Sequence, residues 1–217
     1  MTPFQIETIK PAINAIHKKY GDRNFAMLYG TGCTTRPHVL FLFMNPTGRN
    51  LSTQKTWKGL RASWVGHKNT WKFFCDLGLF SAVLNKKIQT MKKNDWTPAF
   101  VEEIYADIAQ HKVYITGLGR CVQPDARYLP DVVFRDSRAV TLQEIEIINP
   151  RVVIAFGNQV ASNLLEQPIK VSESRCKKYD LVIGKKKYPV YPTFYPVGMG
   201  FRNIGKAIED IKSILQI

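Results

Sequence analysis

The sequence has no cysteine motif, no long apolar run and two long stretches without a carboxylate, and each absence narrows what the chain can be. Its cysteines lie far apart with no Cys-x-x-Cys pair, which argues against a disulfide scaffold and a compact zinc site. We expect buried free thiols at Cys33, Cys75, Cys121 and Cys176. The longest apolar run, 39–44, is far shorter than the ~20 residues that cross a bilayer. Because no basic segment followed by an apolar core opens the chain, we expect a soluble intracellular protein, either cytoplasmic (nucleoid) or nuclear, with no membrane partner.

Acidic residues are absent from two segments of a strongly basic chain, whose formal net charge is +14. No Asp or Glu lies between Asp22 and Asp76, where the basic residues are Arg23, Arg36, Arg49, Lys55, Lys58, Arg61, Lys68 and Lys72. None lies between Asp180 and Glu209 either, where they are Lys185, Lys186, Lys187, Arg202 and Lys206. A surface that only contacts solvent usually carries both acidic and basic residues. This distribution therefore favours phosphate-binding surfaces over a basic face that is only solvated.

The length of the chain and the order of its apolar segments predict one α/β domain over 1–217, because 217 residues suffice for one core and are short for two. Four short apolar runs predict strands at 38–44, 112–117, 151–156 and 188–194. Helical spacing predicts helices at 1–20, 71–84, 98–109, 137–148, 159–165 and 204–215. Strands that alternate with helices pair in parallel, so we expect a three-layer α/β/α sandwich with a central four-stranded, mainly parallel sheet.

The carboxyl ends of the predicted strands locate the functional edge, because ligands of such sheets bind where the strands end. These ends present the segments 45–48, 118–121, 157–158 and 195–202. The first and the last of them lie inside the two acid-free segments. Topology and charge therefore predict the same active edge.

Several of these segments, in the same order, are similar to motifs of the uracil-DNA glycosylase superfamily. Leu28-Tyr-Gly-Thr-Gly-Cys33 and Phe43-Met-Asn-Pro-Thr-Gly48 resemble the opening of the family and its first motif. The stretch 64–73 resembles the aromatic loop of the mismatch-specific branch, and 113–121, 137–150 and 152–161 resemble the iron-sulfur branch. Tyr195–Arg202 resembles the second motif. The order carries the resemblance, since Asn-Pro-x-Gly alone is merely a turn.

The resemblance implies a monofunctional DNA glycosylase that hydrolyses the N-glycosidic bond of a damaged or mismatched base, such as uracil, in base excision repair. In the family the first motif holds the attacking water and the second enters the minor groove. The catalytic residues would then be Asn45, which positions water, and Tyr195, which stabilises the leaving base. The base would contact Met44, Pro46, Thr47, Gly48, Trp64, His67, Asn69 and Gly117. The DNA strand would contact Arg49, Lys68, Pro196, Gly198, Met199, Gly200, Phe201 and Arg202.

The sequence also departs from the family pattern. Of the four cysteines that bind the cluster in the iron-sulfur branch, only Cys121 has a counterpart, and Ser137 stands where another would be. We therefore expect no cluster, no other metal and no cofactor. Gly117 replaces the Asn that reads uracil in several branches, which leaves the excised base open. Tyr195 replaces the usual His of the second motif, so its hydrogen bond to the base would differ in geometry and strength.

Each candidate also has an ordinary structural interpretation. Asn45 precedes a proline and forms turns. Trp64 is our candidate for stacking the flipped base, with Trp57 second, but an aromatic residue of this kind is equally typical of a core. Met199 and Phe201 are candidates for a wedge that opens the stack, or for packing beneath the last helix.

The remaining polar candidates carry weaker signals. Arg202 would meet a phosphate or simply be solvated. His67 either orients the base or caps a turn, and Asn69 and Asn158 are more typical of helix caps than of ligands. The run Lys185–Lys187 predicts a hairpin-like loop with solvated charges.

Two other functions stay open at the level of sequence. One is a module of the same fold that recognises damaged or single-stranded DNA without cutting it, which Tyr195 and Gly117 make plausible. The other is a nucleotide- or dinucleotide-using α/β enzyme. Against this second alternative, the pair Gly30-x-Gly32 precedes the first strand instead of following it, and no phosphate loop is present. We expect a monomer whose partner is DNA.

Overall fold

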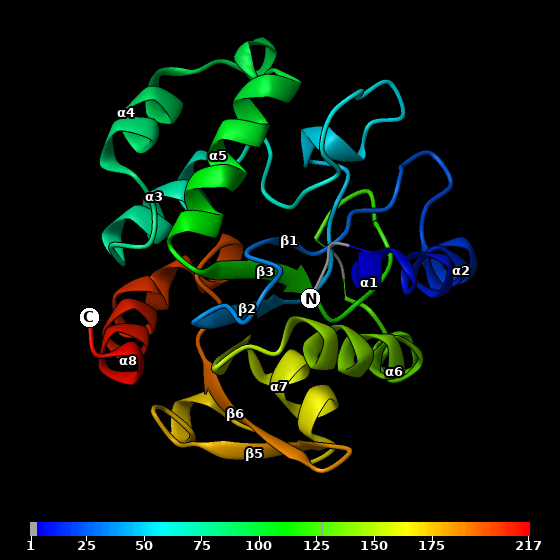
Figure 1. Ribbon diagram of the computed structural model, residues 1–217, viewed down its shortest axis with the longest axis vertical. Coiled ribbons are helices and arrows are strands. Elements are labelled where there is room, and N and C mark those ends of the chain that lie inside the picture. Colours follow the sequence, from blue (N-terminus) through cyan, green and yellow to red (C-terminus); the bar gives the residue numbers. More distant parts are fainter. Residues whose placement is uncertain (1–3, 127) are drawn as a thin grey trace.

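A six-stranded sheet forms the centre of the computed structural model, which describes residues 4–126 and 128–217 (Figure 1). The strands lie in the order β1-β3-β2-β4-β6-β5. Their bounds are β1 Thr31–Gly32, β2 Val39–Phe43, β3 Val113–Gly117, β4 Val152–Phe156, β5 Tyr179–Ile183 and β6 Lys186–Thr193. The four central strands pair in parallel, and β1 and β5 pair antiparallel at the edges. The α/β class is confirmed, whereas the predicted number of four strands is wrong.

The four predicted strands are the parallel ones, and the two that were missed are short or half-exposed edges. β1 has two residues and no apolar signal. In β5 only Leu181 is fully buried, because an edge strand packs against the core on one face. The turn Gly184-Lys185 joins β5 to β6, so the hairpin expected around Lys185–Lys187 is confirmed.

Helices cover both faces of the sheet. Successive side chains of a strand point to opposite faces, and in β2 Phe41 belongs to one core while Leu40 and Leu42 belong to another. Figure 1 shows α3, α4 and α5 on one side and α6 and α7 on the other. The helices are α1 Phe4–Glu7, α2 Lys10–Tyr20, α3 Lys68–Asp76, α4 Ala82–Thr90, α5 Pro98–Gln110, α6 Asp131–Ile148, α7 Asn158–Leu165 and α8 Ile204–Leu215. None of the described helices is both long and apolar enough to cross a membrane.

Some predicted helix boundaries differ from the observed ones. The helix predicted at 71–84 is two helices, α3 and α4, because the chain turns at Gly78 with φ 74° and Ser81 caps the Leu84 amide of α4. α6 begins at Asp131, directly after Pro130, and not at 137. The helix predicted at 1–20 is the pair α1 and α2, with positions 1–3 outside the described residues. The boundaries of α8 match the prediction.

The four cysteines are free, as expected, but they are not all buried. Cys33 and Cys121 are buried and Cys75 is partly buried. Cys176 is exposed, so the prediction of a buried thiol is wrong there, because the loop between α7 and β5 carries it on the surface.

Phe41 provides a test of the core that supports the carboxyl edge. Its ring is fully buried and lies 5.3 Å from Phe74 and 5.7 Å from Phe156, between ring centroids. We expect Phe41→Ala to lower the free energy of unfolding by about 3–5 kcal/mol, because the lost ring leaves a cavity. Urea unfolding followed by circular dichroism measures this. Val83, which is 78% exposed, is the control, and Val83→Ala should change the value by less than ~0.5 kcal/mol.

Candidate functional site

The loops that follow β2 and β6 meet in one pocket at the carboxyl edge of the sheet. The pocket has a volume of about 490 Å³. From the loop after β2 it is lined by Met44, Asn45, Pro46, Thr47 and Arg49, and from the segment after β6 by Tyr195, Val197, Gly198 and Gly200. The segment 63–67 adds Ser63, Trp64 and His67, and the end of β3 with the loop after it adds Thr116, Gly117, Gly119 and Arg120. The two acid-free segments thus contribute opposite walls of one cavity.

Hydrogen bonds to the segment after β3 hold the loop that carries Asn45. Leu118 N donates to Phe43 O at 2.9 Å, and Gly119 N donates to Met44 O at 2.7 Å. These bonds continue the parallel pairing of β2 with β3 past the ends of both strands. Position 119 is tight, since a Cβ there would lie 3.0 Å from Asn45 Cβ. The backbone of the Asn45 loop is therefore set by its neighbour strand.

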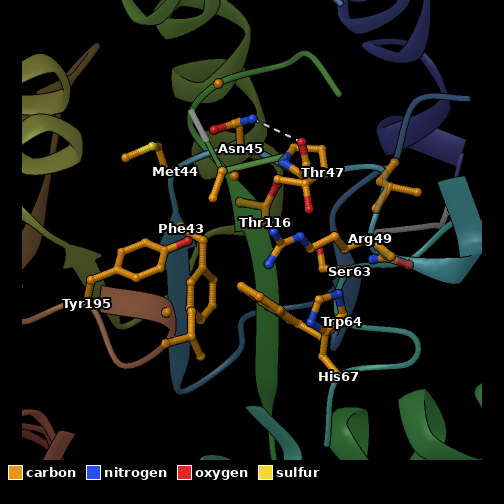
Figure 2. A pocket seen from close by; sticks show the side chains of 18 of the residues that line it. Phe43, Met44, Asn45, Thr47, Arg49, Ser63, Trp64, His67, Thr116 and Tyr195 are labelled. Carbon is orange, nitrogen blue, oxygen red and sulfur yellow. Dashed lines mark hydrogen bonds between the residues drawn. The ribbon is translucent and has the colours of Figure 1, made fainter. Parts of the chain in front are cut away.

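Asn45 lies in the pocket with its amide group anchored (Figure 2). Its Nδ2 donates to Pro46 O at 3.0 Å and, at a longer 3.5 Å, to Cys121 O. These two contacts use the N–H bonds of the amide. The side-chain oxygen is the atom left to accept a hydrogen bond from a water molecule or a ligand.

Trp64 forms a wall of the pocket in an unusual backbone conformation. Its φ is 65°, in the left-handed region that a bulky residue rarely adopts. Its carbonyl accepts from Trp71 Nε1 at 3.0 Å, and its ring meets that of Phe43 edge-on with centroids 4.8 Å apart. Its own Nε1 is buried and has no hydrogen-bond partner among the described residues. Trp57, the second stacking candidate, does not line the pocket and donates its indole N–H to Leu60 O.

His67 lies beside Trp64, at the residue that precedes α3. The two rings are edge-on at 5.6 Å between centroids, and the His67 side chain makes no capping hydrogen bond, so the capping interpretation is wrong. Burial lowers the pKa of His67 from its usual 6.5, and the positive charge of Arg49 lowers it further. The imidazole is thus neutral near pH 7, although a hydrogen bond to the Arg49 backbone opposes part of this shift.

Tyr195 faces the pocket from the segment after β6. Its ring is edge-on to Phe43 and Phe156, with centroid distances of 5.9 and 6.3 Å. Burial raises the pKa of its hydroxyl above the usual 10. The phenol is therefore protonated at neutral pH and available as a donor. Gly200 is required for this conformation, because a Cβ there would lie 2.0 Å from Tyr195 O.

A buried ion pair lies under the floor of the pocket. Arg120 is 1% exposed, and its guanidinium pairs with Glu144 and donates to Thr116 Oγ1 at 2.8 Å and to Thr141 Oγ1 at 3.1 Å. Glu144 also accepts from Tyr114 Oη at 2.9 Å and from Thr116 Oγ1 at 3.0 Å. The charges are therefore matched and hydrogen-bonded, as buried charges must be. The sequence did not indicate this cluster, because its members come from β3, the loop after it and α6.

The pocket is positively charged, but most basic residues of the two acid-free segments do not line it. No Asp or Glu is among the described residues that line it, and Arg49 lies at its rim. Arg61 instead donates to backbone carbonyls of Ser52, Gln54 and Trp57, and Lys72 pairs with Asp76. Lys185 lies in the turn before β6, and Lys186 and Lys187 begin that strand, at the end opposite the one that leads into the pocket.

Several predicted site residues lie outside the pocket lining. Gly48 packs on the ring of Phe25, where any Cβ would collide at 2.2 Å. Lys68 and Asn69 are on the first turn of α3, and Lys68 Nζ donates to Gln89 O. Pro196 is buried, whereas Phe201 and Arg202 are exposed on the short 3-10 helix Gly198–Asn203, and the Met199 side chain falls outside the described part of the chain.

Asn158 is not a helix cap. It is the first residue of α7, which Gly157 precedes with φ 86°, and its Oδ1 accepts from Val171 N at 2.9 Å. The Asn158 side chain therefore anchors the segment before β5 and is not placed to bind a ligand.

Sequence analysis missed other residues of the pocket. Tyr128 lies at the rim and is 77% exposed, an unusual place for an aromatic ring without a partner surface. Gln159 is held by Leu129 O and Asp131, and Ser63 faces the pocket beside Trp64. Tyr128 does not directly follow a predicted strand, so its position in the sequence gave no indication that it belongs to the site.

No cluster of three or more His, Cys, Asp or Glu that could hold a metal ion occurs within residues 4–126 and 128–217. The chain matches no model of a known protein family.

The electrostatics of His67 can be tested by NMR titration. We expect a pKa below 6.5, and we expect Arg49→Met to raise it while leaving it below 6.5, because burial is the larger cause. Since the folded-state pKa is the lower one, this group costs no stability above pH 6.5 and destabilises the fold as the pH falls from there toward the folded-state pKa. A His67 pKa that does not respond to Arg49→Met would contradict the assigned effect of the Arg49 charge.

Proposed function

We propose that the chain is a DNA glycosylase that removes a damaged or mismatched base, uracil or a related deaminated base, by hydrolysing its N-glycosidic bond. One observation carries the proposal: Asn45, Trp64 and Tyr195 line a single pocket with no carboxylate among its described lining residues. The volume of about 490 Å³ falls in the range of small-ligand sites, ~300–1,000 Å³, and is ample for a nucleobase. The sequence resemblance supports the same activity.

The chemistry of this reaction suits the side chains present. Departure of the base leaves oxocarbenium character on the sugar and negative charge on the base. The free side-chain oxygen of Asn45 accepts a hydrogen bond from the attacking water and orients it toward the anomeric carbon. The protonated hydroxyl of Tyr195 donates to the base as negative charge develops there. A neutral His67 completes the polar wall without an added positive charge.

The surroundings of the pocket suit an extruded nucleotide. A base in a duplex is inaccessible, so it must leave the stack and find an aromatic surface. The Trp64 and Phe43 rings provide that surface. Phe201, which is 54% exposed on the segment after β6, is the proposed wedge, and Arg49 and Arg202 are proposed to contact phosphates. In this proposal the protein acts as a monomer in base excision repair, in the nucleoid or the nucleus.

A second candidate is a DNA-binding module that does not cut. It is favoured by the anchoring of the Asn45 amide to Pro46 O, which leaves one polar atom of that side chain for chemistry. An oligonucleotide assay separates the two, with alkali cleaving the strand wherever a base has been lost.

We expect Asn45→Ala to reduce excision by at least ~100-fold with little change in DNA affinity, because the water loses its acceptor while the phosphate contacts stay. Uracil-, hypoxanthine- and mismatch-containing oligonucleotides are the substrates, and binding is measured by fluorescence anisotropy. Asn69→Ala is the matched control, since Asn69 is exposed on α3 and does not line the pocket. Equal excision by wild type and Asn45→Ala would refute the water site.

Tyr195→Phe keeps the ring and removes its donor. We expect excision to fall by ~10²–10³-fold, in the range found for loss of one donor to a developing anion. Single-turnover kinetics isolate this step, and the loss should be smaller for a base whose anion is intrinsically more stable. A uniform loss across such leaving groups would assign Tyr195 to packing alone.

A further inference from the structure

A second hollow lies beside the candidate site, on the other side of Met27. It has a volume of about 330 Å³ and is lined by Asn14, His17, Lys18, Gly21, Arg23, Phe25 and Met27. These residues come from α2 and the segment that follows it. Met27 also lines the main pocket, so the two cavities are neighbours. We call this hollow the α2 groove.

The α2 groove is tied to the loop that carries Asn45. Gln123 Nε2 donates to Tyr20 O at 2.8 Å, at the end of α2. The backbone of Gln123 meanwhile donates to Pro46 O at 3.2 Å and accepts from Gly48 N at 2.7 Å. On the other flank, Phe25 lines the groove and packs its ring on Gly48. A strand that leaves the main pocket over Gly48 therefore meets the α2 groove next.

The groove carries two cations that no carboxylate neutralises. Lys18 and Arg23 are both exposed, and neither forms an ion pair within the described residues. The neighbouring Lys19 differs, because it forms an ion pair with Asp136 and its charge is already matched. No Asp or Glu is among the described residues that line the groove. Arg23 is also the first basic residue of the acid-free segment that supplies the main pocket.

The polar groups that remain free in the groove are donors. Both ring nitrogens of His17 already have partners, since Val122 N donates to its Nδ1 at 3.3 Å and its Nε2 lies 3.0 Å from Phe25 O. Asn14 Oδ1 accepts from Tyr29 Oη at 2.9 Å, which leaves the N–H bonds of the Asn14 amide. Lys18, Arg23 and Asn14 thus all offer N–H donors, which favours a ligand rich in acceptor oxygens.

The carboxyl end of α2 is unfavourable for an anion, because the last carbonyls of a helix carry partial negative charge. Two of these carbonyls are already occupied here. Gly21 N donates to His17 O at 2.7 Å, and Gln123 donates to Tyr20 O. The negative potential at the end of α2 is therefore reduced, and the positive charges of Lys18 and Arg23 dominate the groove.

We propose that the α2 groove binds backbone phosphates of the DNA strand that flank the nucleotide held in the main pocket, with Lys18 and Arg23 as the phosphate contacts and Asn14 as an added donor. The naming of DNA as the polymer rests on the proposed function. The groove would extend the binding surface beyond the rim of the pocket. It would also give a role to Lys18 on α2 and Arg23 on the segment after it, which do not line the main pocket. The strand would run from Arg49 over Gly48 to Arg23.

The test is salt-dependent binding of the full chain to fluorescein-labelled single strands that contain no damaged base. We expect the double variant Lys18→Ala/Arg23→Ala to bind a strand of about 15 nucleotides more weakly, with the slope of log K against log salt reduced by about 1.4, as for two lost phosphate contacts on a single strand. A strand of three nucleotides, which carries only two internucleotide phosphates, should lose much less. Both side chains are exposed, so the thermal midpoint should be unchanged.

The control is Lys185→Ala/Lys212→Ala, which removes the same charge from exposed positions that line neither cavity. We expect this variant to keep the wild-type slope. Equal slope changes in the two double variants, or an unchanged slope in Lys18→Ala/Arg23→Ala, would overturn the groove. Because the strands carry no excisable base, these outcomes are independent of glycosylase activity. Failure of the proposed function would instead appear as intact binding without excision.

Discussion

The backbone pairing of β2 with β3, continued into the loops by Leu118 N to Phe43 O and Gly119 N to Met44 O, determines the geometry of the whole site. It brings the Asn45 loop onto the segment 117–123, and that segment in turn reaches both the pocket floor and the end of α2. The contact requires a small residue at Gly119, where a Cβ would crowd the Asn45 side chain. Loss of this pairing would separate the two cavities as well as the walls of the first.

Beneath this edge, buried charge and aromatic packing have different roles. The Arg120–Glu144 pair is enclosed by hydroxyls of Thr116, Thr141 and Tyr114, so it anchors α6 to the end of β3 without leaving an unmatched charge. Removing one partner would leave an unmatched buried charge, which is strongly destabilising. On the other side of the sheet, stacked and edge-on rings around Phe41 supply the apolar burial.

The site combines an anchored amide, a protonated phenol and a strained tryptophan with an unpartnered indole N–H. The backbone conformation and the indole N–H of Trp64 are departures from what packing alone would select, since strain and unsatisfied donors cost stability. The amide, the phenol and the tryptophan gather at the carboxyl edge of the parallel strands, in a pocket whose described lining residues include no Asp or Glu, and the proposed function rests on that arrangement. The α2 groove, which shares Met27 with this pocket, is the place that we propose for flanking phosphates.

The four parallel strands, the helices α5, α7 and α8, and the sheet edge of the candidate site could be predicted from the sequence alone. Buried strands and amphipathic helices each give a recognisable spacing of apolar residues. The sequence did not determine the edge strands β1 and β5, which bury too little to leave a signal, or the break between α3 and α4 at Gly78. It also placed Asn45, Trp64 and Tyr195 in the candidate site, since they follow strand ends or lie in the acid-free segment. The segment 118–121 was expected at this edge, but the pairing of Arg120 with Glu144 on α6 was not, and neither were Tyr128 and the α2 groove beside the site. These depend on contacts between segments far apart in the chain, such as Gln123 Nε2 to Tyr20 O, which leave no local pattern in the sequence.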